Sequence, residues 1–354
     1  MAKQEESPVL IERRGRLLAL VLNRPRVLNS LNLDMIRRLQ RALEDGQRDD
    51  QVRLMVLSGA GDRGFCAGGD LKGLLGAVQV GAYHRSDEFF REEYALDLLI
   101  HQFRKPVVVL ADGITMGGGL GLAAGADFVV ATERSRLAMP ETRIGFFPDV
   151  GATGWLFAKC PPGYPEYLSL TGYEMVGAEG VRLGLASHLV PCSHLAELNE
   201  ALVQLSARLA ADKGEAVQQL RGLLDSFAEG AAKDLPSRPE LDAWVAEHFA
   251  GQRTLGDIVA SLRQCSLELK VCTEVFQRLS ERSPTALALT LKLLRANEGR
   301  PLPEVFQREI RAGRFMIQQP DYLEGIRARL IDKDDKPRWQ PASIEALGRL
   351  KVEF

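Results

Sequence analysis

DGITMGGGLGLAAGADFVVATERSRLAMPETRIGFFPD, residues 112–149, is the stretch of sequence that decides the fold. The apolar run PVVVLA at 106–111 leads into it and predicts a strand buried on both faces. Asp112 and Gly113 give a turn signal, and glycines 117–119 then open a short helix of small apolar residues. A helix that starts in this way leaves backbone N–H groups without intrahelical partners, a setting that stabilises a developing negative charge.

Glycines 117–119 fit two interpretations. Glycine has no Cβ, so a ligand oxygen can approach the main chain closely. The same residues also fit a turn or a close packing point between a helix and a strand. The functional interpretation is favoured by the residues that follow, because Glu141 and Asp149 lie among apolar, Gly and Pro residues. Carboxyl groups in such surroundings tend to have raised pKa values or fixed partners, as catalytic acids and bases do.

The N-terminal part alternates between strand and helix patterns. LLALVL at 17–22 predicts a strand, and a helix with apolar residues at 35, 36, 39 and 43 follows, capped by Ser30 or Asn32. A second strand at 53–58 runs into a second glycine loop at 64–72. This alternation is typical of an α/β protein. Two glycine loops that each follow a strand suit an oxyanion hole, in which paired N–H donors stabilise a carbonyl oxygen under attack.

Composition indicates an ordinary globular protein of one large domain or two. The 354 residues are 45% hydrophobic and 26% charged, with a formal net charge of −2, so no basic surface for nucleic acid is expected. The five cysteines are odd in number and never spaced as CxxC. This favours reduced thiols in a cytosol-like compartment and argues against a disulfide framework and a zinc site. The five histidines are scattered, so no metal is expected.

Targeting signals are not evident in the sequence. No uncharged apolar run approaches the roughly 20 residues that a membrane span needs. The N-terminal segment carries Glu5, Glu6 and Glu12, unlike an acid-poor transit peptide. We therefore predict a soluble, intracellular protein, cytoplasmic in location, and a mitochondrial location of a processed form stays open.

The composition changes near residue 195. Strand-like runs end there and helical periodicities take over, at 198–209, 217–227, 255–262 and 287–294. The predicted division is therefore a core at 1–195 that carries the site, followed by a helical region at 196–354 that covers the site and supplies oligomer contacts.

Three motifs together resemble the enoyl-CoA hydratase/isomerase (crotonase) superfamily: FCAGGDL at 65–71, GITMGGG at 113–119 and MPE at 139–141. The FFREEY segment at 89–94, the extension of MPE to MPETRIGFFPDVG, and EGIRARLIDKD at 324–334 resemble its thioester-hydrolase branch. The resemblance covers nearly the whole chain. It implies a spiral of stacked ββα turns with a helical C-terminal part, acting on an acyl-CoA.

The resemblance also assigns site residues by motif. The oxyanion amides fall on Gly69 and Gly118, and the substrate-contacting glutamate of FFREEY falls on Glu93. The catalytic acids fall on Glu141 and Asp149. The reaction implied is hydrolysis of a short branched β-hydroxyacyl-CoA thioester, in which Glu141 is either the nucleophile or the base for water. Asp149 would bind the substrate hydroxyl or shuttle a proton.

Binding of the coenzyme is implied with less detail. The adenine would lie near the loop that includes Ala67, Asp70 and Leu71, and Arg26 is a candidate for phosphate contact, with Arg24 and Lys72 as further candidates. No cofactor is expected, since coenzyme A enters as part of the substrate. The resemblance further implies a homo-oligomer, either a trimer or a hexamer.

One departure from the superfamily pattern is informative. Hydratases of this fold place a glutamate three residues after the oxyanion glycine, whereas this chain has Gly121 there. Syn addition of water to a double bond uses two facing glutamates, so hydratase activity is disfavoured. Hydratase or isomerase activity nevertheless stays an alternative, and so does a non-catalytic protein that binds acyl-CoA or RNA on the same scaffold.

Each site residue also has a structural interpretation. Glu93 fits a solvated helix face, and Asp149 fits a helix N-cap. Glu141 can cap a helix or pair with Arg143. Cys66 is interpreted as a small buried filler rather than a nucleophile, because no histidine lies near it in the sequence. Asp70 is expected to order its loop.

Overall fold

A computed structural model describes residues 7–231, 235–265, 270–348, 350 and 352. The chain forms two compact units built from interleaved segments. Unit 1 contains Met1–Gly69, Ala95–Leu137 and Met175–Ser237, and unit 2 contains Asp70–Tyr94, Ala138–Glu174 and Arg238–Phe354.

This division differs from the predicted boundary at residue 195. Helices α8 (Leu195–Ser206) and α9 (Lys213–Ala228) pack on the sheet of unit 1, although they lie beyond that boundary. Residues 70–94 and 138–174 precede the boundary but pack with the C-terminal helices in unit 2. The change in composition near residue 195 therefore marks the end of strand-forming sequence and not a division between compact units.

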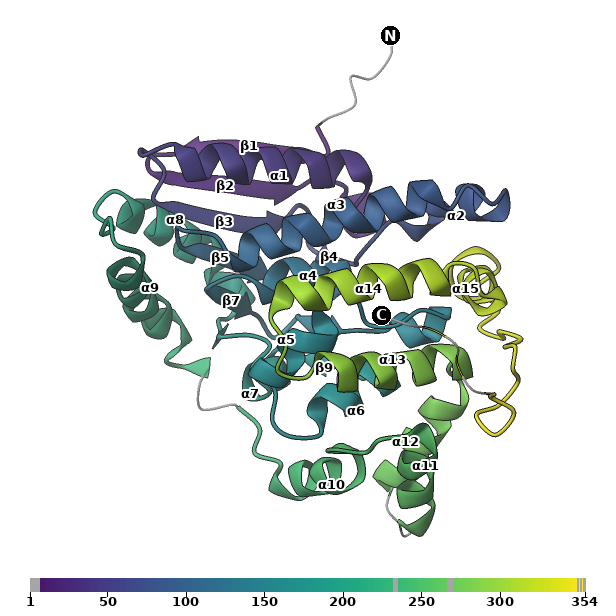
Figure 1. Ribbon diagram of the computed structural model, residues 1–354. Helices are drawn as coiled ribbons and strands as arrows, with labels where there is room; N and C mark the ends of the chain where they lie inside the picture. The colour runs from purple at the N-terminus through teal and green to yellow at the C-terminus, as the bar shows by residue number, and fades with distance from the viewer. Residues whose placement is uncertain (1–6, 232–234, 266–269, 349, 351, 353–354) are drawn as a thin grey trace. The chain divides into compact units, whose positions relative to one another are not determined.

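The main element of unit 1 is a six-stranded sheet with the order β1-β2-β3-β5-β7-β10 (Figure 1). Strand β1 pairs antiparallel with β2, and the other pairs are parallel. The strands are β1 (Val9–Arg14), β2 (Leu17–Leu22), β3 (Leu54–Gly59), β5 (Val107–Ala111), β7 (Phe128–Ala131) and β10 (His188–Leu189). Strands β5 and β7 are buried along their whole length, as continuous apolar runs predict.

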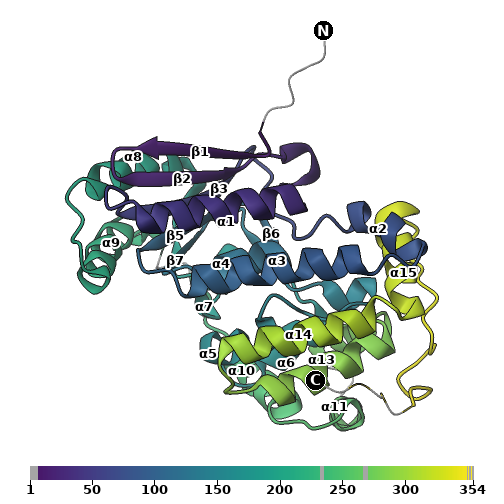
Figure 2. The same cartoon turned by 45° about the horizontal axis from the view of Figure 1, so that its top comes forward.

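Alternate residues of the strands face opposite sides of this sheet. Leu17, Val56 and Val108 lie on the face covered by α8 and α9, whose buried leucines complete one apolar core. Helix α1 (Leu33–Arg48) packs against both β1 and β2 (Figures 1 and 2). Helix α1 begins where predicted, because the Asn32 side chain accepts a hydrogen bond from the Met35 N–H at 2.9 Å.

A second, four-stranded sheet has the order β4-β6-β8-β9. Its strands are β4 (Gly64–Cys66), β6 (Ile114–Met116), β8 (Arg136–Ala138) and β9 (Met175–Val176). Helix α4 (Gly118–Ala124) follows β6 after a one-residue turn and is buried throughout. Unit 1 also contains α7 (Gly177–Arg182) and the short 3-10 helices η1 (Pro25–Val27) and η3 (Cys192–His194).

Unit 2 consists mainly of helices, and α13 and α14 lie side by side within it (Figures 1 and 2). Its elements are α2 (Leu71–Gln79), η2 (Glu141–Ile144), α5 (Ala152–Lys159), α6 (Tyr164–Thr171), α10 (Pro239–Phe249), α11 (Leu255–Gln264), α12 (Lys270–Ser280), α13 (Pro284–Asn297), α14 (Leu302–Met316), α15 (Pro320–Ile326) and η5 (Arg327–Ile331). Helix α3 (His84–His101) contributes to both units. Across the described part of the chain, no helix combines the length and the apolar composition needed to cross a membrane.

One cysteine pair departs from the sequence prediction. Cys265, which follows α11, and Cys272 in α12 form a disulfide, with their Cα atoms 6.5 Å apart. The prediction that the thiols are reduced was wrong for this pair. The hairpin of α11 and α12 brings together two cysteines whose spacing in the sequence matches no redox motif. Cys66, Cys160 and Cys192 are free thiols.

Candidate functional site

The two predicted glycine loops lie against each other in unit 1. Strands β4 and β6, which lead into the loops, pair in parallel with Gly64 opposite Ile114. A Cβ atom placed on Gly68 would come within 3.3 Å of the Gly118 nitrogen, and one placed on Gly119 would overlap the Cys66 carbonyl. Gly119 therefore serves close packing, which was the structural interpretation of the triplet. Gly118 begins α4, so its N–H has no acceptor within the helix.

The first loop is also held by the segment that follows β2. The Gly68 carbonyl accepts a hydrogen bond from the Leu31 N–H at 2.8 Å, and the Leu28 carbonyl accepts one from the Ala67 N–H at 3.0 Å. Gly69 forms an isolated bridge with Leu31. These bonds fix the main chain on both sides of Gly68, which has a φ of 96° that favours glycine.

The three predicted carboxyl groups lie in unit 2, and all of them are buried. Glu93 is 2% exposed, Glu141 is 7% exposed and Asp149 is 6% exposed. The interpretation of Glu93 as a residue on a solvated helix face was therefore wrong. Glu93 belongs to α3, Glu141 begins η2, and Asp149 precedes α5. The structure thus collects carboxyl groups from three separate elements into the interior of one unit.

Hydrogen bonding divides these carboxyl groups into two kinds. Glu93 Oε1 and Glu141 Oε2 are buried without a hydrogen-bond partner. Burial raises the pKa of both groups, and the charge of Asp149 raises the pKa of each further. Burial raises the pKa of Asp149 to about 6, while the hydroxyl of Tyr94, which donates to Asp149 Oδ2 at 2.6 Å, opposes that rise. Asp149 is therefore the member of the cluster that ionises most readily.

Buried aromatic rings pack together around Tyr94, the residue that donates to Asp149. Phe90 stacks on Phe146 with ring centroids 5.3 Å apart, and Tyr94 packs against Phe306 at 5.7 Å. Tyr322 packs against Phe146 at 5.5 Å, and its own hydroxyl is buried without a partner. A carboxyl group among such rings keeps few contacts with water, so its neutral form is favoured.

Asp149 is not the N-cap of α5, contrary to one interpretation of the sequence. The capping residue is Gly151, and the first turn of α5 is bound by a side chain from α14. Glu309 Oε2 accepts from the Gly151 N–H at 2.6 Å, and Glu309 Oε1 accepts from the Thr153 N–H at 3.2 Å and from the Thr153 hydroxyl at 2.5 Å. Burial raises the pKa of Glu309 to about 8, and these hydrogen bonds oppose the rise.

Sequence reasoning missed Glu309, Tyr94 and Tyr322 as members of this cluster. A signal for Glu309 was present, because it lies on the stripe of α14 that also buries Val305, Ala312 and Met316. A carboxyl group on the apolar face of a helix needs a partner or a function.

Close backbone contacts hold the segment that carries both catalytic candidates. A Cβ atom on Gly145 would overlap the carbonyl of Asp321 in α15, and one on Gly325 would overlap the backbone of Ile144. Gly145 also has a φ of 70°. The segment between Glu141 and Asp149 is thus pressed onto α15 at two glycines, with no room for a side chain at either.

The residues predicted to bind the coenzyme have varied surroundings. Arg26 is exposed within η1, whereas the Arg24 guanidinium donates to the Ser30 carbonyl at 2.7 Å. Ala67 is half-buried in the first glycine loop. Asp70 and Leu71 stand at the start of α2. Their roles in binding stay predictions.

The structure also bears on the non-catalytic interpretations of Cys66 as a buried filler and of Glu141 as a partner of Arg143. Cys66 is fully buried, and its sulfur accepts from the Gly68 N–H at 3.4 Å, as expected of a filler that supports the loop. Glu141 is buried with Oε2 unpaired, and Arg143 is exposed, so the structure gives no support to an ion pair between them.

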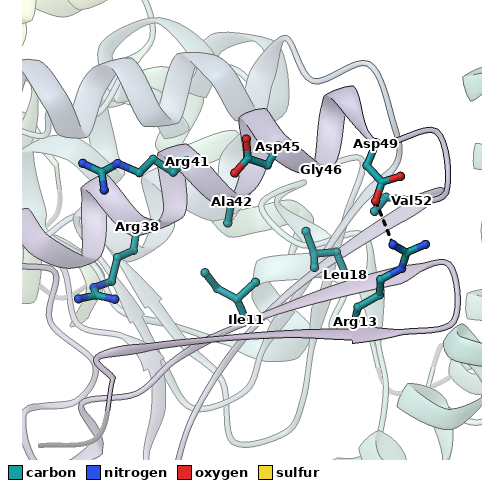
Figure 3. Close-up of a pocket in the computed structure, with 10 residues that line it drawn as sticks. All are labelled: Ile11, Arg13, Leu18, Arg38, Arg41, Ala42, Asp45, Gly46, Asp49 and Val52. Atoms are coloured by element: carbon teal, nitrogen blue, oxygen red, sulfur yellow. Dashed lines mark hydrogen bonds and ion pairs between the residues drawn. The ribbon is translucent and has the colours of Figure 1, made fainter.

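A surface cavity of about 400 Å³ lies in unit 1, between α1 and the β1–β2 hairpin (Figure 3). Arg38 and Arg41 lie together near one end of it, and Asp49 pairs with Arg13 at the other end, at 3.0 Å. Arg38 pairs with Asp34 at 2.9 Å. Because most of these charges neutralise each other, we assign no chemistry to the cavity. Among the described residues, no group of three or more His, Cys, Asp or Glu side chains can hold a metal ion.

Comparison with known proteins establishes the family. The model of the enoyl-CoA hydratase/isomerase family matches residues 17–353, so the chain belongs to that family. It is 38% identical over 345 residues to the mitochondrial 3-hydroxyisobutyryl-CoA hydrolase of Rattus norvegicus. The aligned region covers 96% of this chain and 86% of the relative. The mitochondrial 3-hydroxyisobutyryl-CoA hydrolase of Danio rerio is 35% identical over 359 residues, and the aligned region covers 100% of this chain and 90% of the relative.

Solved structures establish the fold. A carnitinyl-CoA dehydratase from Mycobacterium thermoresistibile matches with a TM-score of 0.85 and 32% identity, over 97% of this chain and 94% of that chain. An enoyl-CoA hydratase from Rhodobacter sphaeroides 2.4.1 matches with a TM-score of 0.84 and 34% identity, over 97% and 95%. The family and the α/β crotonase fold indicated by the sequence motifs are confirmed.

Proposed function

We propose that this chain is an acyl-CoA thioester hydrolase that converts 3-hydroxyisobutyryl-CoA to 3-hydroxyisobutyrate and CoA, a step of valine catabolism. The observation that carries the proposal is the buried trio of Glu93, Glu141 and Asp149, combined with Gly121 at the position where hydratases of this fold have a glutamate. Relatives named as this hydrolase, 34–38% identical over nearly the whole chain, support it.

The proposed reaction begins at the thioester carbonyl. The N–H groups of Gly69 and Gly118 donate to the carbonyl oxygen and stabilise the negative charge that develops on it, by about 3 kcal/mol for each donor. Glu141 acts as its carboxylate. It either attacks the carbonyl carbon to give an acyl-enzyme anhydride, which water then hydrolyses, or it removes a proton from the attacking water. In both routes the C–S bond breaks and CoA leaves as the thiolate, which takes up a proton.

The carboxyl groups beside Glu141 bind the acyl end of the substrate. Asp149 accepts a hydrogen bond from the β-hydroxyl group as its carboxylate, and Glu93 completes the polar end of the pocket. The raised pKa of Glu141 makes its ionised form a stronger base and nucleophile than an exposed glutamate. No cofactor takes part, and the CoA moiety contacts Ala67, Leu71 and Arg26.

The proposal is tested by measuring free-thiol release across a panel of acyl-CoA esters, with Glu141→Gln and Asp149→Asn as controls. We expect the branched β-hydroxyacyl ester to be cleaved fastest and both variants to be impaired. Absence of thiol release from every ester by the wild-type protein would refute the proposal. Single turnover in heavy-oxygen water separates the two routes, because only the anhydride route places label in Glu141.

A second candidate is hydratase or isomerase activity, which is favoured by the similarity to solved structures of an enoyl-CoA hydratase and a carnitinyl-CoA dehydratase. Loss of the conjugated absorbance of an enoyl-CoA measures it directly, and Gly121 predicts little or none. A non-catalytic protein that binds acyl-CoA or RNA is the candidate from another class, and retention of Glu141 and Asp149 argues against it. Assembly as a trimer or hexamer and a cytoplasmic location stay predictions, although the hydrolase relatives are named as mitochondrial.

A further inference from the structure

We infer that Glu309 of α14 is a positioning residue for Asp149, the carboxylate proposed to bind the substrate hydroxyl. The inference rests on the proposed function for the role of Asp149. It rests on the geometry of residues 149–153 for the role of Glu309.

The turn that follows Asp149 is strained. Val150 has a φ of 51°, and Gly151 follows with a φ of 80°. Glycine adopts such angles readily, but a β-branched residue rarely does, so the backbone at Val150 is strained. Such a backbone persists only where its surroundings hold it in place. The orientation of the Asp149 side chain depends on whatever holds this turn.

Glu309 supplies a side-chain restraint, in addition to the main-chain bond in which the Ala152 N–H donates to the Asp149 carbonyl at 2.9 Å. Its carboxyl oxygens accept from the amides of Gly151 and Thr153 and from the Thr153 hydroxyl, so a single side chain binds the residues that follow Val150. The Thr153 hydroxyl in turn accepts from Asn297 Nδ2 at 2.8 Å. The Trp155 indole N–H donates to the Val150 carbonyl at 3.0 Å and adds a further restraint.

Helix α14 also contacts the residue that donates to Asp149. Phe306 lies one turn before Glu309, and a Cβ atom on Gly151 would come within 2.8 Å of its ring. The same ring packs against Tyr94, whose hydroxyl donates to Asp149. Helix α14 thus contacts the turn after Asp149 through Glu309 and Phe306. It also contacts the Tyr94 ring through Phe306.

An ordinary helix cap predicts a different result from a positioning residue. Loss of a cap lowers the stability of the protein and leaves the chemistry unchanged. Loss of a positioning residue lowers the rate, because displacement of a reacting group by about 1 Å can cost roughly 100-fold. Glu309→Gln is the sharper substitution, since it keeps the shape but replaces one acceptor oxygen with an NH2 group that faces an N–H donor.

The experiment measures kcat and KM for the β-hydroxyacyl-CoA ester in wild type, Glu309→Gln, Asp149→Asn and the double variant. We expect Glu309→Gln to lower kcat by about 100-fold with KM changed by less than about 3-fold. In the Asp149→Asn background the same substitution should lower kcat by less than about 2-fold, because its effect acts through Asp149. Equal losses in both backgrounds, or no loss in the first, would overturn the inference.

Two further measurements keep the test decisive. Glu166→Gln removes another buried carboxyl of unit 2, one paired with Arg295, and should leave kcat within about 3-fold of wild type. If Glu309→Gln does not fold, Thr153→Val removes one donor to Glu309 and should show the same pattern with a smaller loss. If the wild-type protein cleaves no ester, the proposed function fails. The inference can then still be tested by following the titration of the Asp149 carboxyl with a carbon-13 label in wild type and in Glu309→Gln. An unchanged titration curve in Glu309→Gln would overturn the inference.

Discussion

Removal of a single hydroxyl group tests the proposed electrostatics of the site. Tyr94→Phe deletes the only hydroxyl that donates to Asp149 among the described hydrogen bonds, and it leaves the ring that packs between Phe90 and Phe306. The donor oxygen lies 2.6 Å from Asp149 Oδ2, and both residues are buried. A hydrogen bond to a charged acceptor contributes about 1.5–3 kcal/mol, which corresponds to about one to two pH units in the titration of the acceptor.

The direction of the change follows from the sign of this interaction. The Tyr94 hydroxyl favours the ionised form of Asp149, whose pKa is about 6 with the hydroxyl present. Without it, the acid limb of the pH profile of kcat/KM should move to higher pH by about one to two units. At pH 7 the ionised fraction then falls from about nine-tenths to between about one-half and one-tenth, so kcat/KM drops about 2-fold to 10-fold. Near pH 9 the two enzymes should have similar rates.

A matched control is available in Tyr322. Its hydroxyl is buried within the same unit but has no hydrogen-bond partner. Tyr322→Phe should therefore leave the acid limb in place, and it should be neutral or slightly stabilising because it removes an unsatisfied polar group. The assay is thiol release between pH 5 and pH 9 with all three proteins. An acid limb at the same pH in Tyr94→Phe and wild type would refute the reasoning.

Three other outcomes are expected. Glu141→Gln should lower kcat by at least about 100-fold, measured by thiol release, whereas a smaller loss would remove Glu141 from the chemistry. Gly325→Ala should destabilise the protein by about 3 kcal/mol in denaturant unfolding, because its Cβ overlaps the Ile144 backbone; Gly222→Ala in α9, where a Cβ meets nothing within 4 Å, should instead stabilise it by up to about 1 kcal/mol. The folded-state pKa of Asp149 is about 6 against 3.8 for the free side chain, so stability should fall as the pH rises from about 4 to 6, by about 3 kcal/mol from this group. Urea unfolding of wild type and Asp149→Asn at several pH values measures how the free energy of unfolding changes with pH. An equal pH dependence in the two proteins would contradict the raised pKa of Asp149.

The sequence predicts the central strands well, because their signal is local. Strands β2, β3 and β5 are largely apolar runs, and each lies within one residue of its predicted position. Strand β1 was missed, since VLIERR carries three charged residues and forms an exposed edge. Its pairing with β2 depends on a neighbour that a pattern within β1 does not reveal.

The interleaving of the two units was beyond local patterns. Residues 138–174 carry Glu141 and Asp149, yet they pack with helices that begin only at Pro239 and continue to the C-terminal part of the chain. Gly145 and Gly325 show why residues 138–174 pack specifically with the C-terminal segment. Each glycine lies in close contact with the backbone of the other segment, with no room for a side chain. A glycine in a sequence predicts that something approaches closely, but not which segment approaches.

The candidate site divides in the same way. Motifs supplied Gly69, Gly118, Glu93, Glu141 and Asp149, because each of these residues lies within a short local motif that resembles the family. Glu309 lies 158 residues from Gly151, whose amide it binds, and no local motif joins them.

The order in which the buried carboxyl groups ionise links the proposed chemistry to the choice of substrate. Asp149 has a hydrogen-bond donor, whereas Glu93 and Glu141 each keep an unpaired oxygen, so Asp149 loses its proton first. Its negative charge then holds the protons on Glu93 and Glu141, because each further charge in a buried cluster costs more. On the proposed roles, a substrate hydroxyl that donates to Asp149 should weaken that field and favour the ionised form of Glu141. An acyl group without the hydroxyl should leave Glu141 protonated, so we expect the preference for β-hydroxyacyl esters to be expressed in kcat more than in KM.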